Sequence, residues 1–315
     1  MHDHFRFDWL RGHAQAKAAA RPAIMLTVAV LAAGCGTAGP PYATGPPHTT
    51  VPPRTTGSPH ATGAPVATGR AHGTGEPHGT VAPRTAGAPR PSATQTARLP
   101  MATTYGTTPK APQDPAPFKP ETGIVVHPAR TRVIYARPGG PAVGALPATE
   151  LGGPTWVPVV QSQPGWDRIL LPTRPNRSTG WIYLGGGGLR TAYTSYQVHI
   201  NLGTYRLTIR DAGRSLGTWP VAEGGPGTPT PTGRTFVLAS LAPLNSTYSP
   251  LILPLGAHSD TLSAFGGGPG TVGLHGWPDR TVFGHAVSHG CVRVPAAALR
   301  ALSRVPLGSS VMITG

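Results

Sequence analysis

Proline and glycine set the main limit on what this chain can fold into. Its 315 residues include 43 glycines and 39 prolines, and both residue types disfavour the interior of helices and strands. The tract 36–120 consists largely of Pro, Gly, Thr, Ala and His, with few large apolar side chains. Such a tract cannot bury enough apolar surface to offset the entropy of ordering its backbone. We therefore expect 36–120 to be a disordered linker.

The first 35 residues are typical of an export signal. Four basic residues precede an apolar run, 23–33, which is too short to span a bilayer. The run ends in Leu31-Ala-Ala-Gly-Cys35, and small residues before a cysteine at this place resemble a lipobox. On this resemblance Cys35 is lipidated, and we expect an exported, membrane-anchored lipoprotein. An ordinary cleaved signal with an incidental cysteine is the alternative.

The region 121–187 has the pattern of a small β domain. Runs rich in β-branched and aromatic residues alternate with Gly/Pro turns, and they cover residues 123–127, 132–136, 155–160, 165–171 and 179–184. The spacing of Trp156, Trp166 and Trp181 resembles that of bacterial Src-homology-three-like domains, which implies a small β-barrel. We expect the three tryptophans to lie in its core; the alternative is a groove that binds a glycan or peptide.

After four glycines at 185–188, the region 192–315 predicts a second, mainly β domain. Residues 197–202 and 205–210 alternate apolar and polar side chains around a Gly-Thr turn, which indicates a hairpin. Further strands are expected at 214–221, 235–239, 251–255, 271–275 and 310–314. One helix is expected from Pro295 to Arg304, because proline is favoured at a first helical position and Pro306 ends the segment.

The stretch 275–293 concentrates the reactive side chains, with three of the 13 histidines and one of the two cysteines. A thiol attacks as its thiolate, so it needs a base or a cation nearby. His289 lies two residues before Cys291, and His275 lies upstream within reach of the same site. Gly290 allows a tight turn in which consecutive N–H groups point at one spot. Cys291 is thus a candidate nucleophile, and no intramolecular disulfide is expected.

The motifs in this region resemble those of the L,D-transpeptidase catalytic domain family of bacterial cell-wall enzymes. They are His275-Gly276, Ser288-His289-Gly290-Cys291, Val292-Arg293 and the upstream 229–236 stretch, PTPTGRTF. The resemblance covers roughly 192–315 and implies a β-sandwich with a short helix after the catalytic cysteine. Residues 121–187 contain no cysteine and only one histidine, His127, so we expect this region to place the enzyme without taking part in the chemistry.

The resemblance also implies roles for the site residues. Cys291 is the nucleophile, and His275 is its general base, held in one tautomer by the carbonyl of Gly276. His289 shapes the site, and the backbone N–H groups of His289, Gly290 and Cys291 stabilise the oxyanion.

Four more side chains are expected to contact the substrate: Arg293, Ser288, Trp277 and Tyr248. Arg293 suits a substrate carboxylate, with a structural ion pair as the alternative. No cofactor and no metal are implied.

By resemblance, the partners are peptidoglycan stem peptides and the cell wall, which an exported protein would face. The enzyme would join the third residue of one tetrapeptide stem to an amine of a second stem, a 3→3 crosslink. Water as acceptor would make it an L,D-carboxypeptidase, and a protein amine would make it a wall-anchoring enzyme. A non-catalytic wall-binding lipoprotein is a further alternative.

Two other classes have less support. A zinc hydrolase could use His275, His285, His289 and Cys291, but the chain has no H-E-x-x-H and no paired C-x-x-C. The net charge of +15 is spread over the sequence without a basic block, which argues against nucleic-acid binding. A diffuse positive charge suits a polyanionic wall surface.

Overall fold

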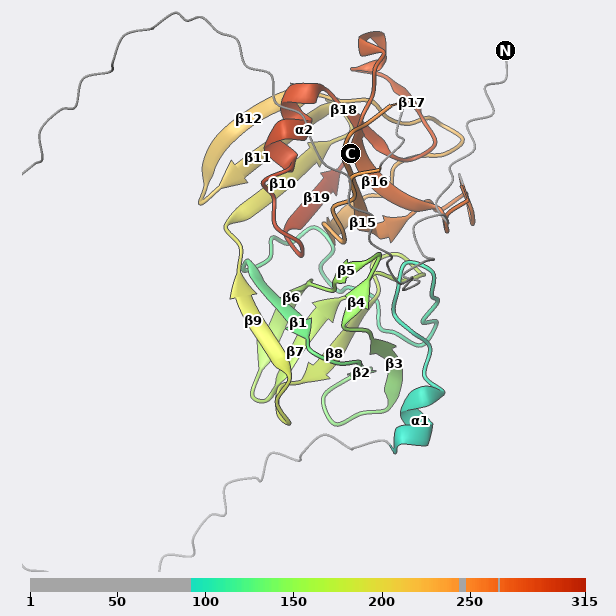
Figure 1. Cartoon of the computed structure of the whole chain (residues 1–315), viewed down its shortest axis with the longest axis vertical. Coiled ribbons are helices and arrows are strands. Elements are labelled where there is room, and N and C mark those ends of the chain that lie inside the picture. The colour runs from blue at the N-terminus through green and yellow to red at the C-terminus, as the bar shows by residue number, and fades with distance from the viewer. Residues whose placement is uncertain (1–91, 244–247, 266) are drawn as a thin grey trace, which may run out of the picture. The chain divides into compact units, whose positions relative to one another are not determined.

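The computed structural model describes residues 92–243, 248–265 and 267–315 (Figure 1). The predicted signal, Cys35 and linker residues 36–91 lie outside the described residues. All described residues belong to one compact unit of the chain. Within the part of the chain that is described, no helix is both long and apolar enough to cross a membrane.

An antiparallel sheet of seven strands forms the N-terminal part, in the order β3-β2-β8-β7-β6-β1-β9. Its strands are β1 Ile124–Pro128, β2 Arg132–Tyr135, β3 Ala142–Leu146, β6 Val157–Gln163, β7 Trp166–Leu170, β8 Thr179–Tyr183 and β9 Leu189–Tyr193. A short ribbon of β4 Thr149–Glu150 and β5 Gly153–Pro154 lies between β3 and β6 in the sequence. The five predicted strands of this region are confirmed. Resemblance to a Src-homology-three-like barrel stays a prediction.

The three tryptophans have different surroundings. Trp166 and Trp181 are buried and form a small cluster with Tyr135, as expected for core residues. Trp156 is half-buried and lies 5.2 Å from the ring of His127. The prediction of a buried tryptophan therefore holds for Trp166 and Trp181 but not for Trp156.

The segment 99–120 is ordered, so the prediction of a disordered linker through Pro120 is wrong for these residues. The helix α1, Ala93–Ala97, precedes the segment, and Ala102 and Thr108 are fully buried. Backbone hydrogen bonds attach the segment to the N-terminal sheet, for example from the Ala102 N–H to the Ala145 carbonyl, at 2.8 Å. The prediction counted large apolar side chains, whereas small side chains and backbone hydrogen bonds hold this segment against the sheet.

The glycines before the second domain lead directly into a strand. Gly186, Gly187 and Gly188 have φ values of 82°, 68° and 69°, which favour glycine. β9 follows at Leu189 and pairs with β1 (Figure 1). The N-terminal sheet thus extends to Tyr193, past the predicted end at residue 187.

The C-terminal part contains a five-stranded sheet in the order β12-β11-β10-β19-β14. Its strands are β10 Tyr196–Asn201, β11 Arg206–Asp211, β12 Arg214–Pro220, β14 Gly233–Phe236 and β19 Ser310–Thr314. The predicted hairpin is confirmed as β10 and β11, and the closing strand β19 runs parallel to β10.

Smaller sheets of the C-terminal part carry the predicted motifs. Their strands are β13 Glu223–Gly224, β15 Ile252–His258, β16 Thr271–Gly276, β17 Ala286–Ser288 and β18 Val292–Val294. β16 lies between β15 and β18, and β13 pairs with β17. Apolar residues of β16 and β18 pack into the same core as those of β10 and β11.

The helix α2, Ala296–Leu302, follows β18 directly. Pro295 is the N-cap rather than the first helical residue, and the helix ends two residues before the predicted Arg304. A short 3-10 helix, η1 Arg280–Val282, lies between β16 and β17.

Candidate active site

Two parallel neighbouring strands bring the predicted nucleophile and base together. In β16 and β18, Leu274 is opposite Val292, and His275 is opposite Arg293. Cys291 directly precedes β18, and a backbone hydrogen bond from Gly273 reaches its thiol. Since side chains alternate along a strand, Cys291 and Arg293 share the face of the sheet that carries His275.

His275 is held in the tautomer that a base requires. Its Nδ1 lies 2.8 Å from the carbonyl oxygen of Gly276, so Nδ1 carries the proton and Nε2 is left as the acceptor. The Gly276 N–H donates to Ser249 Oγ at 2.7 Å, and Ser249 Oγ donates to the Leu251 carbonyl at 2.5 Å. These bonds orient the peptide on which His275 depends.

Burial keeps both reactive groups uncharged at neutral pH. His275 is only 6% exposed, and burial lowers its pKa to about 4, against the opposing effect of the Gly276 carbonyl. Burial raises the pKa of the Cys291 thiol, which the Gly273 hydrogen bond and Arg293 partly offset. At pH 7 the pair is therefore a thiol and a neutral imidazole, so the proton must move as the sulfur attacks.

Hydrogen bonds inside the loop 288–291 fix its shape. Ser288 Oγ donates to the Cys291 carbonyl at 2.6 Å and accepts the Gly290 N–H at 3.1 Å. Gly290 has φ 111°, a conformation that favours glycine. Ser288 was predicted to contact substrate, but its hydroxyl is used within the loop, and so is the Gly290 N–H.

An aromatic wall lies beside His275. The ring of Tyr248 meets His275 edge-on, with centroids 5.1 Å apart, and lies 5.8 Å from Trp277. The guanidinium of Arg293 lies 3.6 Å from the ring centroid of Trp277. Burial and the charge of Cys291 both raise the pKa of Tyr248, which places this phenol near the sulfur. The structure thus gathers three predicted substrate-binding residues around the pair.

His289 lies apart from this wall. It is exposed, and its ring stacks on that of Phe265, with centroids 4.8 Å apart and an angle of 26°. His285 is exposed as well, and its carbonyl accepts the N–H of Glu223. Over the described ranges, no three His, Cys, Asp or Glu side chains are grouped so that they could hold a metal ion.

Residues 195–313 match YkuD, the L,D-transpeptidase catalytic domain. No curated protein matches the sequence. The matched range begins just before β10, ends within β19 and includes every predicted catalytic residue.

Solved structures of L,D-transpeptidases are similar to this chain at low identity. One from Mycobacterium smegmatis is 14% identical, covers 48% of this chain and 91% of its own, and has a TM-score of 0.32. The catalytic domain from Enterococcus faecium is 20% identical, covers 38% and 95%, and has a TM-score of 0.30. One from Mycobacterium tuberculosis H37Rv is 12% identical, covers 60% and 95%, and has a TM-score of 0.35.

Several residues in the matched range that hold the site were missed in the sequence. Thr230 Oγ1 donates to the Gly290 carbonyl at 2.9 Å and accepts the Gly224 N–H at 2.9 Å. Thr228 Oγ1 donates to the Ser288 carbonyl, also at 2.9 Å. Both threonines lie in or next to the PTPTG stretch, so the motif marked the segment without showing what its hydroxyl groups contact.

Glu223 was missed as well. It is buried on β13, beside the strand that leads into the nucleophile loop, and burial raises its pKa to about 7. Among the described residues, none donates a hydrogen bond to its Oε2. A single glutamate between an alanine and a glycine gave no signal in the sequence.

Proposed function

We propose that this protein is a cell-wall L,D-transpeptidase that forms 3→3 peptidoglycan crosslinks through an acyl-enzyme on Cys291. The observation that carries the proposal is the pairing of β16 with β18, which puts His275 and Cys291 on one face of a sheet. The match of residues 195–313 to the L,D-transpeptidase catalytic domain supports peptidoglycan stem peptides as the substrate class.

In the first half-reaction, Nε2 of His275 takes the thiol proton while Sγ of Cys291 attacks the carbonyl carbon of the third stem residue. The tetrahedral oxyanion is stabilised by backbone N–H groups of the loop. Because the Gly290 N–H already donates to Ser288 Oγ, we assign this role to the N–H groups of His289 and Cys291. The C–N bond to the terminal D-alanine then breaks, and the His275 imidazolium gives its proton to the leaving amine.

In the second half-reaction, the side-chain amine of another stem attacks the thioester. Neutral His275 accepts the proton of the attacking amine, the C–S bond breaks, and the His275 imidazolium gives that proton to the departing thiolate of Cys291. The products are the crosslinked stems and the free enzyme. The low pKa of His275 suits this cycle, because the imidazole returns to its neutral form after each transfer.

Arg293 and the aromatic wall supply the substrate contacts in this proposal. Among the described residues, none accepts a hydrogen bond from the buried Nε of Arg293, and a buried donor without a partner is costly. A carboxylate of the stem would satisfy it with a charge-assisted hydrogen bond. The ring of Trp277 holds the guanidinium in place from one side.

Two measurements on the full chain test the proposed function. Incubation with a carbapenem should add one acyl group to Cys291, which intact mass and peptide mapping detect, and Cys291→Ala should stay unmodified. With a disaccharide-tetrapeptide substrate, the enzyme should release D-alanine and form a 3→3 dimer. Release of D-alanine with only a tripeptide product indicates an L,D-carboxypeptidase, and transfer only to a protein amine indicates wall anchoring. A folded protein that forms no adduct and releases no D-alanine would disprove the proposal.

We also propose that the protein is exported and held at the membrane through lipidated Cys35, with the catalytic domain facing the cell wall. The support is the apolar run 23–33 followed by Ala-Ala-Gly-Cys. Two or more acyl chains anchor a protein stably, whereas one gives only marginal binding. Cys35→Ala should therefore move the protein from the membrane fraction to the soluble fraction, and unchanged partitioning would contradict this proposal.

A further inference from the structure

One loop of the N-terminal sheet contacts two segments of the catalytic domain. This loop, residues 171–178, connects β7 to β8. Its Asn176 pairs with the backbone of His258 in both directions: Nδ2 donates to the His258 carbonyl at 2.6 Å, and Oδ1 accepts the His258 N–H at 2.8 Å. His258 is the last residue of β15. The pairing therefore fixes the point where the chain leaves β15 for the connection to β16.

Arg174 of the same loop binds this connection along its length. Its Nη1 donates to the Ser259 carbonyl at 3.0 Å, and its Nη2 donates to the carbonyls of Leu262, at 2.9 Å, and Pro269, at 3.0 Å. A guanidinium is planar and holds its N–H donors in a fixed arrangement. One side chain thus fixes three carbonyls, two near the start of the connection and one near its end.

Phe265, in the chain between β15 and β16, links Arg174 to the catalytic motif. This residue lies between Leu262 and Pro269 in the sequence, and its ring stacks on His289. His289 is the second residue of the nucleophile loop 288–291. A shift of the chain between β15 and β16 would therefore displace His289, whose N–H group we assign to the oxyanion.

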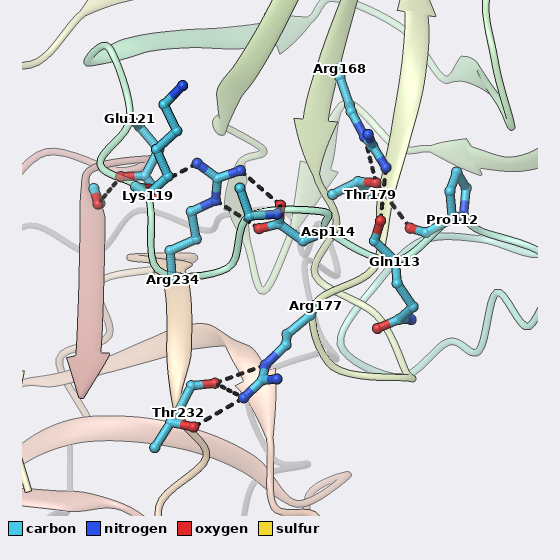
Figure 2. A network of polar contacts seen from close by, with 12 residues as sticks. Pro112, Gln113, Asp114, Lys119, Glu121, Arg168, Arg177, Thr179, Thr232 and Arg234 are labelled. Carbon is cyan, nitrogen blue, oxygen red and sulfur yellow. Dashed lines mark hydrogen bonds and ion pairs between the residues drawn. The ribbon is translucent and has the colours of Figure 1, made fainter. Parts of the chain in front are cut away.

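Arg177 reaches the other flank of the nucleophile loop. Its Nε and Nη2 donate to the Thr232 carbonyl at 3.0 and 2.8 Å, and Nη2 also donates to Thr232 Oγ1 at 3.0 Å (Figure 2). Two residues earlier, Thr230 donates its hydroxyl to the Gly290 carbonyl. The residue that Arg177 holds, Thr232, and the residue that holds the loop, Thr230, are only two positions apart. A displacement of Thr232 would therefore pass to Thr230 with little backbone between them to absorb it.

A buried ion pair next to this contact holds the same segment. Arg234 donates from Nε and Nη2 to the two carboxylate oxygens of Asp114 at 2.7 and 2.8 Å, and from Nη1 to the Lys119 carbonyl at 2.9 Å (Figure 2). Asp114 belongs to the ordered segment 99–120. The contacts of the N-terminal part thus continue past Thr232 into β14.

We propose that the loop 171–178 positions the nucleophile loop for acyl transfer, with Arg174 and Arg177 as positioning residues. The inference rests on the proposed function, and it replaces the expectation that the N-terminal region only places the enzyme. The hydrogen bonds of both arginines go to segments that in turn contact the loop. Misplacement of a reacting group by about 1 Å can cost about 100-fold in rate, so a small shift of the His289 or Gly290 peptide is enough to slow acylation.

The test compares Arg174→Met and Arg177→Met with a matched control in the full chain. Methionine keeps much of the side-chain length and removes the donors. Arg168→Met is the control, because the hydrogen bonds of Arg168 to described residues go to Thr179 Oγ1 and the Gln113 carbonyl, both in the N-terminal part (Figure 2). We expect the rate of acylation by a carbapenem to fall by about 10-fold to 100-fold in Arg174→Met and to stay within about twofold in Arg168→Met. Arg177→Met should also slow acylation.

A spectroscopic measurement separates positioning from a general loss of structure. The Phe265 ring should shift the ring-proton resonances of His289, and Phe265→Leu should remove that shift. Arg174→Met should move the His289 resonances towards those of Phe265→Leu, while Arg168→Met leaves them in place. The double variant of Arg174→Met and Phe265→Leu should be no slower than the slower single variant, because both act through one contact.

The possible outcomes distinguish this inference from the proposed function. If folded Arg174→Met keeps the wild-type acylation rate and His289 resonances, the inference is overturned. If Arg174→Met does not fold, Arg174→Lys decides: it keeps the charge but cannot span three carbonyls, so wild-type acylation and His289 resonances in this variant would overturn the inference. If the wild-type protein is not acylated at all, the proposed function fails, and the His289 resonances still show whether Arg174 positions the loop.

Discussion

The guanidinium of Arg293 lies 3.6 Å from the ring centroid of Trp277, one strand away from the histidine that we assign as the base. The planar group lies over the indole ring, and its Nε is buried. Lysine offers a flexible point charge and cannot reproduce a planar, stacked donor. The two side chains therefore form one rigid unit, to which our proposal assigns a substrate carboxylate.

Arg293→Lys should lower kcat/KM for a tetrapeptide stem by about 10-fold to 100-fold, since a hydrogen bond to a charged group contributes about 1.5–3 kcal/mol. The sharper measurement uses two stems, one with a free carboxylate at the D-alanine and one with this group amidated. The wild-type enzyme should favour the free carboxylate, and Arg293→Lys should lose most of that preference. Equal turnover of both stems by the wild-type enzyme would show that Arg293 has another role.

His275→Gln should lower the rate of Cys291 acylation by about 10²–10⁴, the usual contribution of a general base. Glutamine keeps a donor for the Gly276 carbonyl but has no basic nitrogen. His285→Gln is a matched control, because His285 is exposed, and it should leave the rate unchanged. A larger loss in His289→Ala than in His275→Gln would mean that the two histidines have exchanged roles.

The pH dependence of acylation should reflect the buried pair. Because the pKa of His275 is lowered to about 4, the neutral base is present at pH 7 and is lost only as the pH falls towards 4. Acylation should therefore keep its neutral-pH rate even at pH values well below 6.5, the pKa of an ordinary histidine. The rate at which iodoacetamide alkylates Cys291 should rise at a higher pH than the rate for a free cysteine, since burial raises the pKa of the thiol. An acid limb near pH 6.5 would contradict this assignment.

Thr230→Val should destabilise the protein and slow acylation together. The variant leaves the Gly290 carbonyl and the Gly224 N–H, both next to the active site, without their partner. A buried polar group left unsatisfied costs about 1–3 kcal/mol. Thr218→Val removes a similar bond, to Thr208 on the exposed face of β11 and β12, and should have little effect on either quantity. Urea unfolding and the carbapenem reaction measure the two effects.

Asp114→Asn should lower the free energy of unfolding by about 3–5 kcal/mol, because it removes the carboxylate that is paired with the buried guanidinium of Arg234. Asp211→Asn, which alters the side-chain bond from Ser195, is the comparison. A loss in Asp114→Asn no greater than that in Asp211→Asn would show that the segment 99–120 contributes little to stability.

Most strands of this fold could be predicted because their side chains alternate, as in β10 and β11. Two of the strands that were missed lack that pattern: β3, AVGAL, has small residues, and β9, LRTAY, is an exposed edge strand. The ordered segment 99–120 was missed for a related reason. Its backbone hydrogen bonds go to a sheet formed by residues far along the chain, and composition carries no information about such partners.

The site divides in the same way. Cys291, His275 and Gly276 could be found because their motif is local, and the structure places the imidazole on the Gly276 carbonyl as expected. Phe265, Thr230 and Arg174 could not be found, since each reaches the loop 288–291 from a separate segment. Ser288 shows the opposite limit: the motif identifies the residue, but only the structure shows that its hydroxyl stays inside the loop.

The position of β19 has a consequence for when the enzyme becomes active. This strand lies inside the five-stranded sheet, between β10 and β14, and pairs Gln197 with Ser310. The sheet therefore stays open until the residues after 309 are present, although Cys291 and His275 come earlier in the sequence. If the chain is exported as we propose, its thiol crosses the membrane before the catalytic domain can close. The enzyme would then assemble its nucleophile only on the side where its substrate is found.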